Sequence, residues 1–593
     1  MARPVGDIRP PGVYISSVEA ASRAFHIGDC RVAGFVGLTA KGPLDVPQRI
    51  SSWDEFVEIY GNVDVGYLAN AVEGFFLNGG QTCWVVRVAH RARGEDAVPG
   101  PEHASFAERV VKDAWDKPTL RVRARSEGRW GNNIWVRFEQ STGAKALLTA
   151  DLEVGSGEAQ VNVTRGFERG ALVRVYDRNS SDYIVLTEIG DRQIKWASAT
   201  PVNRRYRAAG PTYLEVIEVE VHAALRDRRE TFRGLQLHNT SRRYVSKVIQ
   251  AESRLIAVDD LGSRSPWPHN MPRSEAAAKL SNGRDGSDDV TPEDIVGYDN
   301  GPGDRAGLLA LGALDDVAML CVPDAMIFPI RKPGPEGDVA AQRVHDQMIT
   351  MCELLKDRFA ILDCPLTRDI ELVRRWRRRT DTSYAAYYWP WVGIVEQDGR
   401  VVKNPSSGHM AGLYARLESE DGVHRAPANE PIKGIVDLSV PITEDDQGVL
   451  NAEAINCFRM SRGIRPWGAR TSSSDPDWRF INVRRLFIML RRSLEEGSRW
   501  VTFEPNTPNT WDSVRSRVKA FLEKLYEKGM FSGGSPDDSF YVKCDAETNP
   551  PELQDMGMLV IEVGVAPAVP AEFIVIRITQ KLGEEGLPAP DEM

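Results

Sequence analysis

The stretch EFIVIRITQK, residues 572–581, is the strongest isolated strand signal in the sequence. Its β-branched and aromatic residues are Phe573, Ile574, Val575, Ile576 and Ile578. Such residues favour β-strands, and a strand with apolar faces and unpaired backbone groups promotes aggregation unless a sheet takes it up. The sequence therefore predicts that this strand pairs with its own sheet or with the sheet of another molecule.

The connector before this strand, APAVP at 566–570, contains two prolines. We expect it to act as a flexible tether that sets the strand apart from the body of the chain. Such a tether would allow the strand to reach a neighbouring molecule, and the protein would then be a subunit of a polymer.

A second arm is predicted at the N-terminus. Prolines 4, 10 and 11 disfavour a helix there. The residues that follow have the pattern of a strand start: Gly12, Val13, Tyr14 and Ile15. We therefore expect residues 1–30 to be extended.

Length and composition restrict the class of protein. A chain of 593 residues predicts three or four domains. No apolar run approaches the ~18 residues that span a bilayer, and the first residues lack the apolar core of a signal peptide. We therefore expect no membrane insertion and synthesis in the cytosol. The seven cysteines contain no CxxC pair, which favours reduced, packed thiols over disulfides or a zinc site.

The alternation of strand and helix signals predicts a multidomain chain of mixed α/β and α+β class. Strand and helix signals alternate from Val32 to Val88, whereas short alternating runs between 117 and 235 predict an inserted β-rich domain. The predicted parts are an N-terminal arm (1–30), an α/β domain in two parts (31–116 and 256–440), the β-rich insert (117–255), a C-terminal α+β domain (441–569) and a C-terminal arm (570–593).

Two amphipathic helices are predicted in the C-terminal domain, at 483–496 and 511–528. Each has an apolar stripe at helical spacing, and each carries basic residues on another face. The basic residues are Arg484, Arg485, Arg491 and Arg492 in the first helix, and Arg517, Lys524 and Lys528 in the second. Ile488 lies among the arginines of the first helix, which indicates a face covered by a partner.

Three other patterns suggest chemistry, but none is complete. The string SSGHMAGLYAR around His409 is similar to the histidine segment of subtilisin-like proteases, yet the aspartate and serine motifs of a triad are missing. The acidic stretch 281–297 does not match the ligand spacing of a calcium loop. The arginines between 374 and 379 suggest an anion or RNA patch, or else a solvated helix face paired with acids on neighbouring subunits. A net charge of −10 argues against general nucleic-acid binding.

Long ordered segments resemble one known family. They include PGVYISSVE at 11–19, GFVGLTAKGPLDVPQRISSWDEFVEIYG at 34–61, YYWPWV at 387–392, PSSGHMAGLYAR at 405–416, GIRPWGARTSSSDPDWRFINVRRLFIML at 463–490, FEPNTPNTW at 503–511 and GVAPAVPAEFIVIRI at 564–578. With these segments the sequence resembles the tail sheath proteins of contractile phage tails and contractile injection systems.

This resemblance implies a structural role rather than catalysis, without cofactor or metal. Subunits of the family form stacked six-membered rings around an inner tube, and their terminal arms add strands to the C-terminal domains of neighbours. The implied partners are other copies of the chain, the inner tube, and baseplate and cap proteins, with no nucleic acid and no membrane insertion. Assembly in the bacterial cytoplasm is expected, and contraction would need no ATP site. A basic face of the C-terminal domain, with the seven side chains named above, is the expected tube contact. The alternative is a subtilisin-like hydrolase that uses His409.

Overall fold

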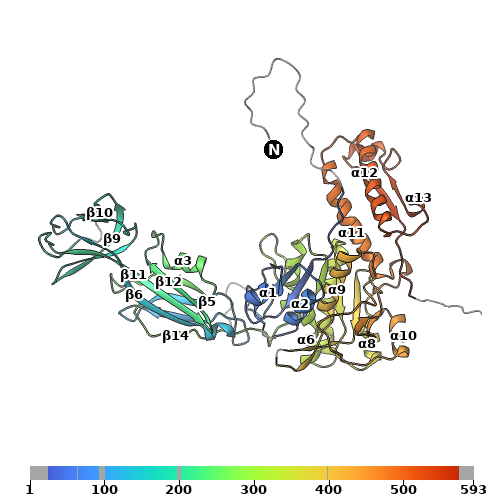
Figure 1. The fold of residues 1–593 in the computed structure, drawn as a ribbon, viewed down its shortest axis with the longest axis horizontal. Coiled ribbons are helices and arrows are strands. Elements are labelled where there is room, and N and C mark those ends of the chain that lie inside the picture. The colour runs from blue at the N-terminus through green and yellow to red at the C-terminus, as the bar shows by residue number, and fades with distance from the viewer. Residues whose placement is uncertain (1–24, 63–64, 93–99, 197–201, 397, 573–593) are drawn as a thin grey trace, which may run out of the picture.

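The computed structural model describes residues 25–572 apart from 63–64, 93–99, 197–201 and 397. Figure 1 shows a central α/β body, a β-rich lobe that projects from one side of it, and a C-terminal domain on another side. Among the helices of the described residues, none is long and apolar enough to cross a membrane. All seven cysteines are buried and unpaired, which confirms the prediction of packed thiols.

The α/β body is built on an eight-stranded sheet with the order β2-β3-β1-β15-β16-β17-β21-β22. Its inner strands run parallel, and β2 and β22 are antiparallel edge strands. The strands are β2 Gln48–Ile50, β3 Cys83–Arg87, β1 Ala33–Gly37, β15 Met319–Cys321, β16 Phe359–Asp363, β17 Ala385–Trp389, β21 Ile455–Met460 and β22 Ile464–Pro466. Because both faces of a parallel sheet are covered, its central strands are apolar throughout.

Helices cover both faces of this sheet. One core contains Phe35 and Ile361 with residues of α2 and α9, and the other contains Val36 and Leu362 with residues of α7. The helices of the body are α1 Trp53–Tyr60, α2 Leu68–Leu77, α4 Pro292–Val296, α5 Gly307–Ala310, α6 Ile327–Arg331, α7 Pro335–Leu355, α8 Ile370–Arg377, α9 Ser407–Glu420 and α10 Glu444–Ala452. Ser52 caps α1 by accepting a hydrogen bond from the Glu55 amide, as its sequence predicts. A small side sheet contains β18 Val392–Val395, β19 Val401–Asn404 and β20 Asp437–Leu438.

The β-rich lobe is larger than the predicted insert at 117–255. Strand β5 pairs with β4 before it and with β13 after it, and both of these strands lie outside those limits. The elements are β4 Glu108–Lys112, β5 Pro118–Ala124, β6 Trp135–Leu147, β7 Glu158–Gln160, β8 Leu172–Tyr176, β9 Ser181–Ile189, β10 Gln193–Trp196, β11 Tyr213–Leu225, β12 Arg228–Leu235, α3 Val245–Glu252, β13 Ile256–Asp260 and β14 Ala278–Lys279. The limits must be widened because backbone pairing, and not local composition, defines the lobe.

The C-terminal domain begins later than predicted. Strands β21 and β22, within the expected domain at 441–569, belong to the large sheet of the body. The domain itself contains α11 Ile481–Ser498, α12 Pro508–Glu527, α13 Pro536–Ser539, β23 Phe540–Lys543, α14 Pro551–Asp555 and β24 Glu562–Val565. Both amphipathic helices are therefore confirmed, each within a few residues of its predicted bounds.

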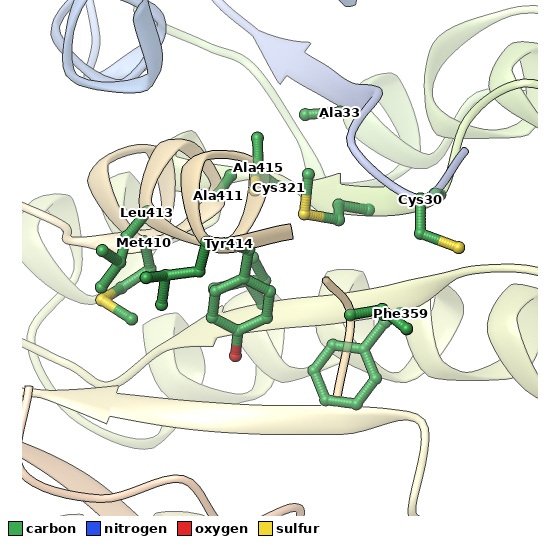
Figure 2. Close-up of a cluster of buried hydrophobic side chains, with 14 of the residues drawn as sticks. Cys30, Ala33, Cys321, Phe359, Met410, Ala411, Leu413, Tyr414 and Ala415 are labelled. Atoms are coloured by element: carbon green, nitrogen blue, oxygen red, sulfur yellow. The ribbon is translucent and has the colours of Figure 1, made fainter. Parts of the chain in front are cut away.

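Helices α2 and α9 lie unusually close together, and glycines make this possible. A Cβ atom on Gly408 would lie 2.2 Å from the carbonyl oxygen of Ala71, and one on Gly412 would lie 2.4 Å from that of Phe75. Figure 2 shows Met410 and Tyr414 of α9 directed into the buried core with Phe359 of the sheet. The glycines of the GHMAG string therefore serve helix packing.

Candidate functional site

The C-terminal domain contains a sheet of only two strands, β23 and β24. They pair antiparallel from Phe540 opposite Val565 to Lys543 opposite Glu562. Helix α12 covers one face, where Phe540 joins the core with Phe521 and Leu525. In the part of the chain that the structure describes, no third strand pairs with either edge. Two-stranded sheets are marginally stable in water, so these edges are suited to accept further strands.

The connector before the C-terminal arm is held against the body. Its backbone is bonded to residues 530–532: the Ser532 amide donates to the Ala566 carbonyl at 2.8 Å, and the Ala568 amide donates to the Met530 carbonyl at 3.2 Å. At its end, the Arg470 guanidinium donates to the Glu572 carboxylate at 2.9 Å. The prediction of a flexible tether at 566–570 is therefore wrong, because hydrogen bonds fix the connector at Ala566 and Ala568 and also hold Glu572, the first residue of the predicted strand.

The residues of both predicted arms lie outside the described residues. They are Gly12, Val13, Tyr14 and Ile15 at the N-terminus, and Phe573, Ile574, Val575, Ile576 and Ile578 at the C-terminus. Their strand pairing stays a prediction.

The root of the N-terminal arm is described, and it lies between the body and the C-terminal domain with the side chains of Phe25, Cys30 and Val32 buried. We call residues 25–32 the N-terminal strap. Phe25 packs against Phe521 of α12 at 5.8 Å between ring centroids, and it fills the space above Gly497 of α11. The Gly28 amide donates to the Ser493 hydroxyl at 2.8 Å. The strap therefore connects both helices of the C-terminal domain to β1.

A buried ion pair fastens this strap. The Cys30 amide donates to Glu418 at 2.8 Å, and Arg485 donates to the other oxygen of Glu418 at 2.6 Å and to the Cys30 carbonyl at 3.0 Å. The exposed fractions of the two charged side chains are 3% for Arg485 and 9% for Glu418. Burial raises the pKa of Glu418, while the neighbouring guanidinium of Arg485 opposes that rise. One arginine thus satisfies a buried carboxylate and a buried carbonyl together.

The prediction that the arginines of α11 form an exposed face is wrong for three of the four. Arg484 is buried and lies over the Trp478 ring at 3.5 Å from its centroid, and Arg485 belongs to the pair with Glu418. Arg492 donates to the backbone carbonyl of Asp357 at 2.9 Å. Ile488 is buried among them, so the chain itself covers this face. Arg491 is exposed.

The basic residues of α12 are more exposed than Arg484 and Arg485 of α11. Lys524 and Lys528 are exposed. Arg517 is partly buried and lies over the Trp500 ring at 4.8 Å from its centroid. The body therefore leaves the two lysines of this basic face accessible to a partner.

The arginine cluster at 374–379 is largely paired inside the chain. Arg374 donates to Glu453 at 2.9 Å, Arg378 donates to the same carboxylate at 3.1 Å, and Arg377 is buried. The two arginines hold the pKa of Glu453 down at about 2. The acids that pair with this helix come from the same chain.

His409 lies in the packed contact between α2 and α9. Its side chain is only 2% exposed, and its ring faces Gly74 so closely that a Cβ there would lie 2.5 Å from it. Burial lowers the pKa of His409 to about 4. Nearby Asp363 accepts hydrogen bonds from the amides of Ser406 and Ser407 at the start of α9. These side chains stabilise the core, and substrate would have no access to the ring.

The N-terminal strap is a feature that sequence patterns did not predict. Its partners Glu418, Arg485 and Ser493 are hundreds of residues or a whole domain away in the sequence, so no local spacing joins them. The one signal was the loss of helical character before residue 30, which indicates an extended segment but not its contacts.

Comparisons with known proteins agree with this geometry. The phage tail sheath protein central domain family matches residues 317–472, and the phage tail sheath C-terminal domain family matches residues 473–581. The border at 472 lies between β22, the last strand of the large sheet, and α11, the first α-helix of the C-terminal domain. The chain is 27% identical over 292 residues to a putative prophage major tail sheath protein of Pseudomonas aeruginosa (strain UCBPP-PA14), covering 48% of this chain and 71% of that protein.

Two further similarities extend the comparison. The tail sheath protein of Escherichia phage P2 is 22% identical over 307 residues, which is 49% of this chain and 72% of that protein. The fold is similar to the sheath in a cryo-EM structure of an extracellular contractile injection system, the PVC sheath complex in its contracted state. That match has a TM-score of 0.51 and 19% identity, and it covers 97% of this chain and 99% of the other.

Proposed function

We infer that the chain is the structural subunit of a contractile tail sheath, because it carries the central and C-terminal domains of the phage tail sheath family. We propose that it polymerises as stacked six-membered rings around an inner tube and contracts to drive that tube through a target envelope. The proposed partners are other copies of the chain, the tube, the baseplate and a terminal cap. Assembly takes place in the bacterial cytoplasm, with no membrane insertion.

The observation that carries this proposal is the two-stranded sheet β23–β24 with its open edges. Strands donated by the arms of neighbouring subunits would complete it, since backbone pairing to a sheet edge gives affinity without a large apolar interface. The strap and the connector support this arrangement. They hold the root of each arm firmly. A force that acts on an arm is therefore transmitted to the body and does not merely extend a loose segment.

Energy for contraction would be stored when the sheath assembles. Rigid subunits move relative to one another while the arms keep them linked, which is one of the known forms of switching between packed states. The wide contacts of the strap with α11 and α12 suit this role, because a firmly packed C-terminal domain moves with the body as one unit. No nucleotide, cofactor or catalytic residue has a part in this proposal.

The inner tube must be held weakly enough to be released. We assign this contact to the basic face of α12, with Lys524, Lys528 and Arg517, and to exposed Arg491 of α11. Exposed ion pairs each contribute only about 0–1 kcal/mol, so many of them can hold a tube that still slides. The buried Arg484 and Arg485 are left out of this surface, and so is the partly buried Arg492, which donates to backbone carbonyls of the chain.

Deletion of residues 571–593 tests the proposed strand exchange. We expect a folded body that no longer forms stable tubes, seen as discrete particles by negative-stain electron microscopy. The matched control is deletion of residues 583–593, which leaves EFIVIRITQK in place and should still give tubes. Normal contractile tubes from the longer deletion would refute the exchange of C-terminal strands.

A further inference from the structure

Three possible metal ligands meet on the outer face of the β-rich lobe. Glu139 projects from β6, and Glu220 and His222 project from the neighbouring strand β11. The ligand atoms that they offer lie within 4.8 Å of one another. Glu139 and Glu220 are directly opposite in the antiparallel ladder, where like charges destabilise a sheet. Their positions in sequence, 139 and 220–222, match no metal motif, so only strand pairing reveals the cluster.

The imidazole of His222 is oriented for a cation. Its Nδ1 atom lies 3.2 Å from the hydroxyl of Thr231 on β12, to which an Nδ1–H group can donate. Its Nε2 atom is shielded from solvent and has no hydrogen-bond partner among the described residues. With the proton on Nδ1, the lone pair of Nε2 faces two carboxylates. That arrangement is repulsive unless a positive charge lies between them.

The two distances from His222 to the carboxylates fit zinc. Nε2 of His222 lies 3.5 Å from Oε2 of Glu139 and 3.6 Å from Oε2 of Glu220. Tetrahedral Zn²⁺ binds nitrogen and oxygen at about 2.0–2.1 Å, so its ligand atoms lie roughly 3.3–3.4 Å apart. The side chains are 24–32% exposed, which gives an ion and a fourth, water ligand access to the cluster.

The surrounding arginines are compatible with an ion. Arg137 pairs with Oε1 of Glu139 and leaves Oε2 for the metal. Such outer partners orient metal-bound carboxylates. Arg233 lies 3.5 Å from Oε2 of Glu220, but its side chain is 74% exposed and can turn into solvent without burying a charge.

We propose that Glu139, Glu220 and His222 bind one Zn²⁺ ion, with water as the fourth ligand. The ion links β6 to β11 and removes the repulsion between the two opposite glutamates. The ligands stand on two paired strands, β6 and β11, and Thr231 on the next strand, β12, orients His222, so the site is rigid. This site stabilises the projecting lobe and is independent of the proposed sheath function.

Metal analysis of the full-length chain tests the site. The protein is incubated with Zn²⁺, passed through a desalting column, and assayed for bound zinc and for thermal unfolding of the chain. We expect about one zinc per chain and a higher Tm with zinc, since a ligand that binds only the folded state stabilises it. Co²⁺ in place of zinc should give the visible absorption of a tetrahedral site.

Variants decide which residues hold the ion. His222→Ala and Glu220→Gln should each lower zinc affinity at least about tenfold and abolish the zinc-dependent rise in Tm. The matched control is His238→Ala, which removes another imidazole of the same lobe that also contacts a threonine hydroxyl. Its zinc content should be that of the unchanged protein.

Two results would overturn the proposal. Equal zinc retention by His222→Ala would place the metal elsewhere. No zinc retained by the unchanged protein, together with a Tm that added zinc does not change, would mean that the three side chains hold no zinc.

Discussion

Helices α11 and α12 share an amphipathic pattern, but their positive charges lie in different surroundings. Both are amphipathic, and both carry several basic residues away from the apolar stripe. In α11 the chain buries Arg484 and Arg485 and covers Ile488, whereas in α12 Lys524 and Lys528 stay exposed. The difference shows that a basic helix face is a surface only where no other part of the chain provides acids, carbonyls or aromatic rings to cover it.

The partners of α11 explain this difference. The guanidinium group of Arg485 donates to Glu418 and to the Cys30 carbonyl. That of Arg484 lies over the Trp478 ring and donates to the Ser383 hydroxyl. Arginine suits these places, because its planar group donates in several directions and stacks on rings. The lysines of α12 carry compact, strongly hydrated charges that are better left in water.

The largest expected effect comes from breaking the buried pair of α11. Arg485→Met leaves Glu418 buried without its cation and the Cys30 carbonyl without a donor. We expect a loss of about 3–5 kcal/mol in the free energy of unfolding, measured by chemical denaturation of the full chain. Adding Glu418→Met removes the uncompensated buried charge and should recover much of the lost stability. A loss below about 1 kcal/mol in the single variant would mean that the pair does not fasten the strap.

A smaller effect is expected from pH, through a buried imidazole. The pKa of His409 is lowered to about 4 in the folded chain, against about 6.5 in an unfolded one. Between these values the unfolded state binds more protons, so stability is full above pH 6.5 and falls as the pH falls towards 4. This difference in pKa corresponds to a loss of roughly 3 kcal/mol at most in the free energy of unfolding.

The contribution of His409 is isolated by comparing the unchanged chain with a variant that lacks this histidine. Asp324 and Asp363 have pKa values raised to about 6 by burial, so they act in the opposite direction and favour the folded state as the pH falls. The difference in unfolding free energy between the unchanged chain and His409→Gln, followed from pH 7 to pH 4, therefore reports the histidine alone. The comparison variant is His238→Gln, which removes a partly exposed imidazole of the β-rich lobe. A similar change in both variants would contradict the prediction.

The smallest effect on stability is expected on α12. Lys524→Glu combined with Lys528→Glu should change the free energy of unfolding by less than about 0.5 kcal/mol, because both side chains are exposed. If this face contacts the inner tube, the same variant should assemble poorly around the tube in electron micrographs. Lys519→Glu, an exposed lysine on another face of the same helix, is the matched control. Unchanged assembly around the tube in the double variant would remove α12 from the proposed contact.

Much of the fold followed from local patterns. The bounds of α11 and α12, the Ser52 cap of α1 and the alternating strands of the insert were predicted, because backbone geometry fixes the periods of helices and strands. The limits of the lobe and of the C-terminal domain were placed wrongly. Strand β4 pairs with β5, β13 pairs with β5 and β21 pairs with β17. The local composition of these segments does not show which strands pair.

The candidate site was predicted less completely than the fold. The strands of the arms were predicted from their composition, and that prediction lies outside the described residues, whereas the tether before the C-terminal arm proved to be fixed. The GHMAG string suggested a catalytic histidine, whereas the glycines serve the close approach of α9 to α2. In each case the residue type was informative, and its surroundings decided the role.

By itself, the sequence determined many of the helices and strands and the resemblance to tail sheaths, and it predicted two terminal arms. These depend on the order and spacing of residue types along the chain. Only the tertiary structure decided which charges are buried, how the strap is held by Glu418 and Arg485, and that Glu139, Glu220 and His222 meet. The physical reason is that the energy of a charge depends on the groups around it, and folding brings those groups from distant parts of the chain.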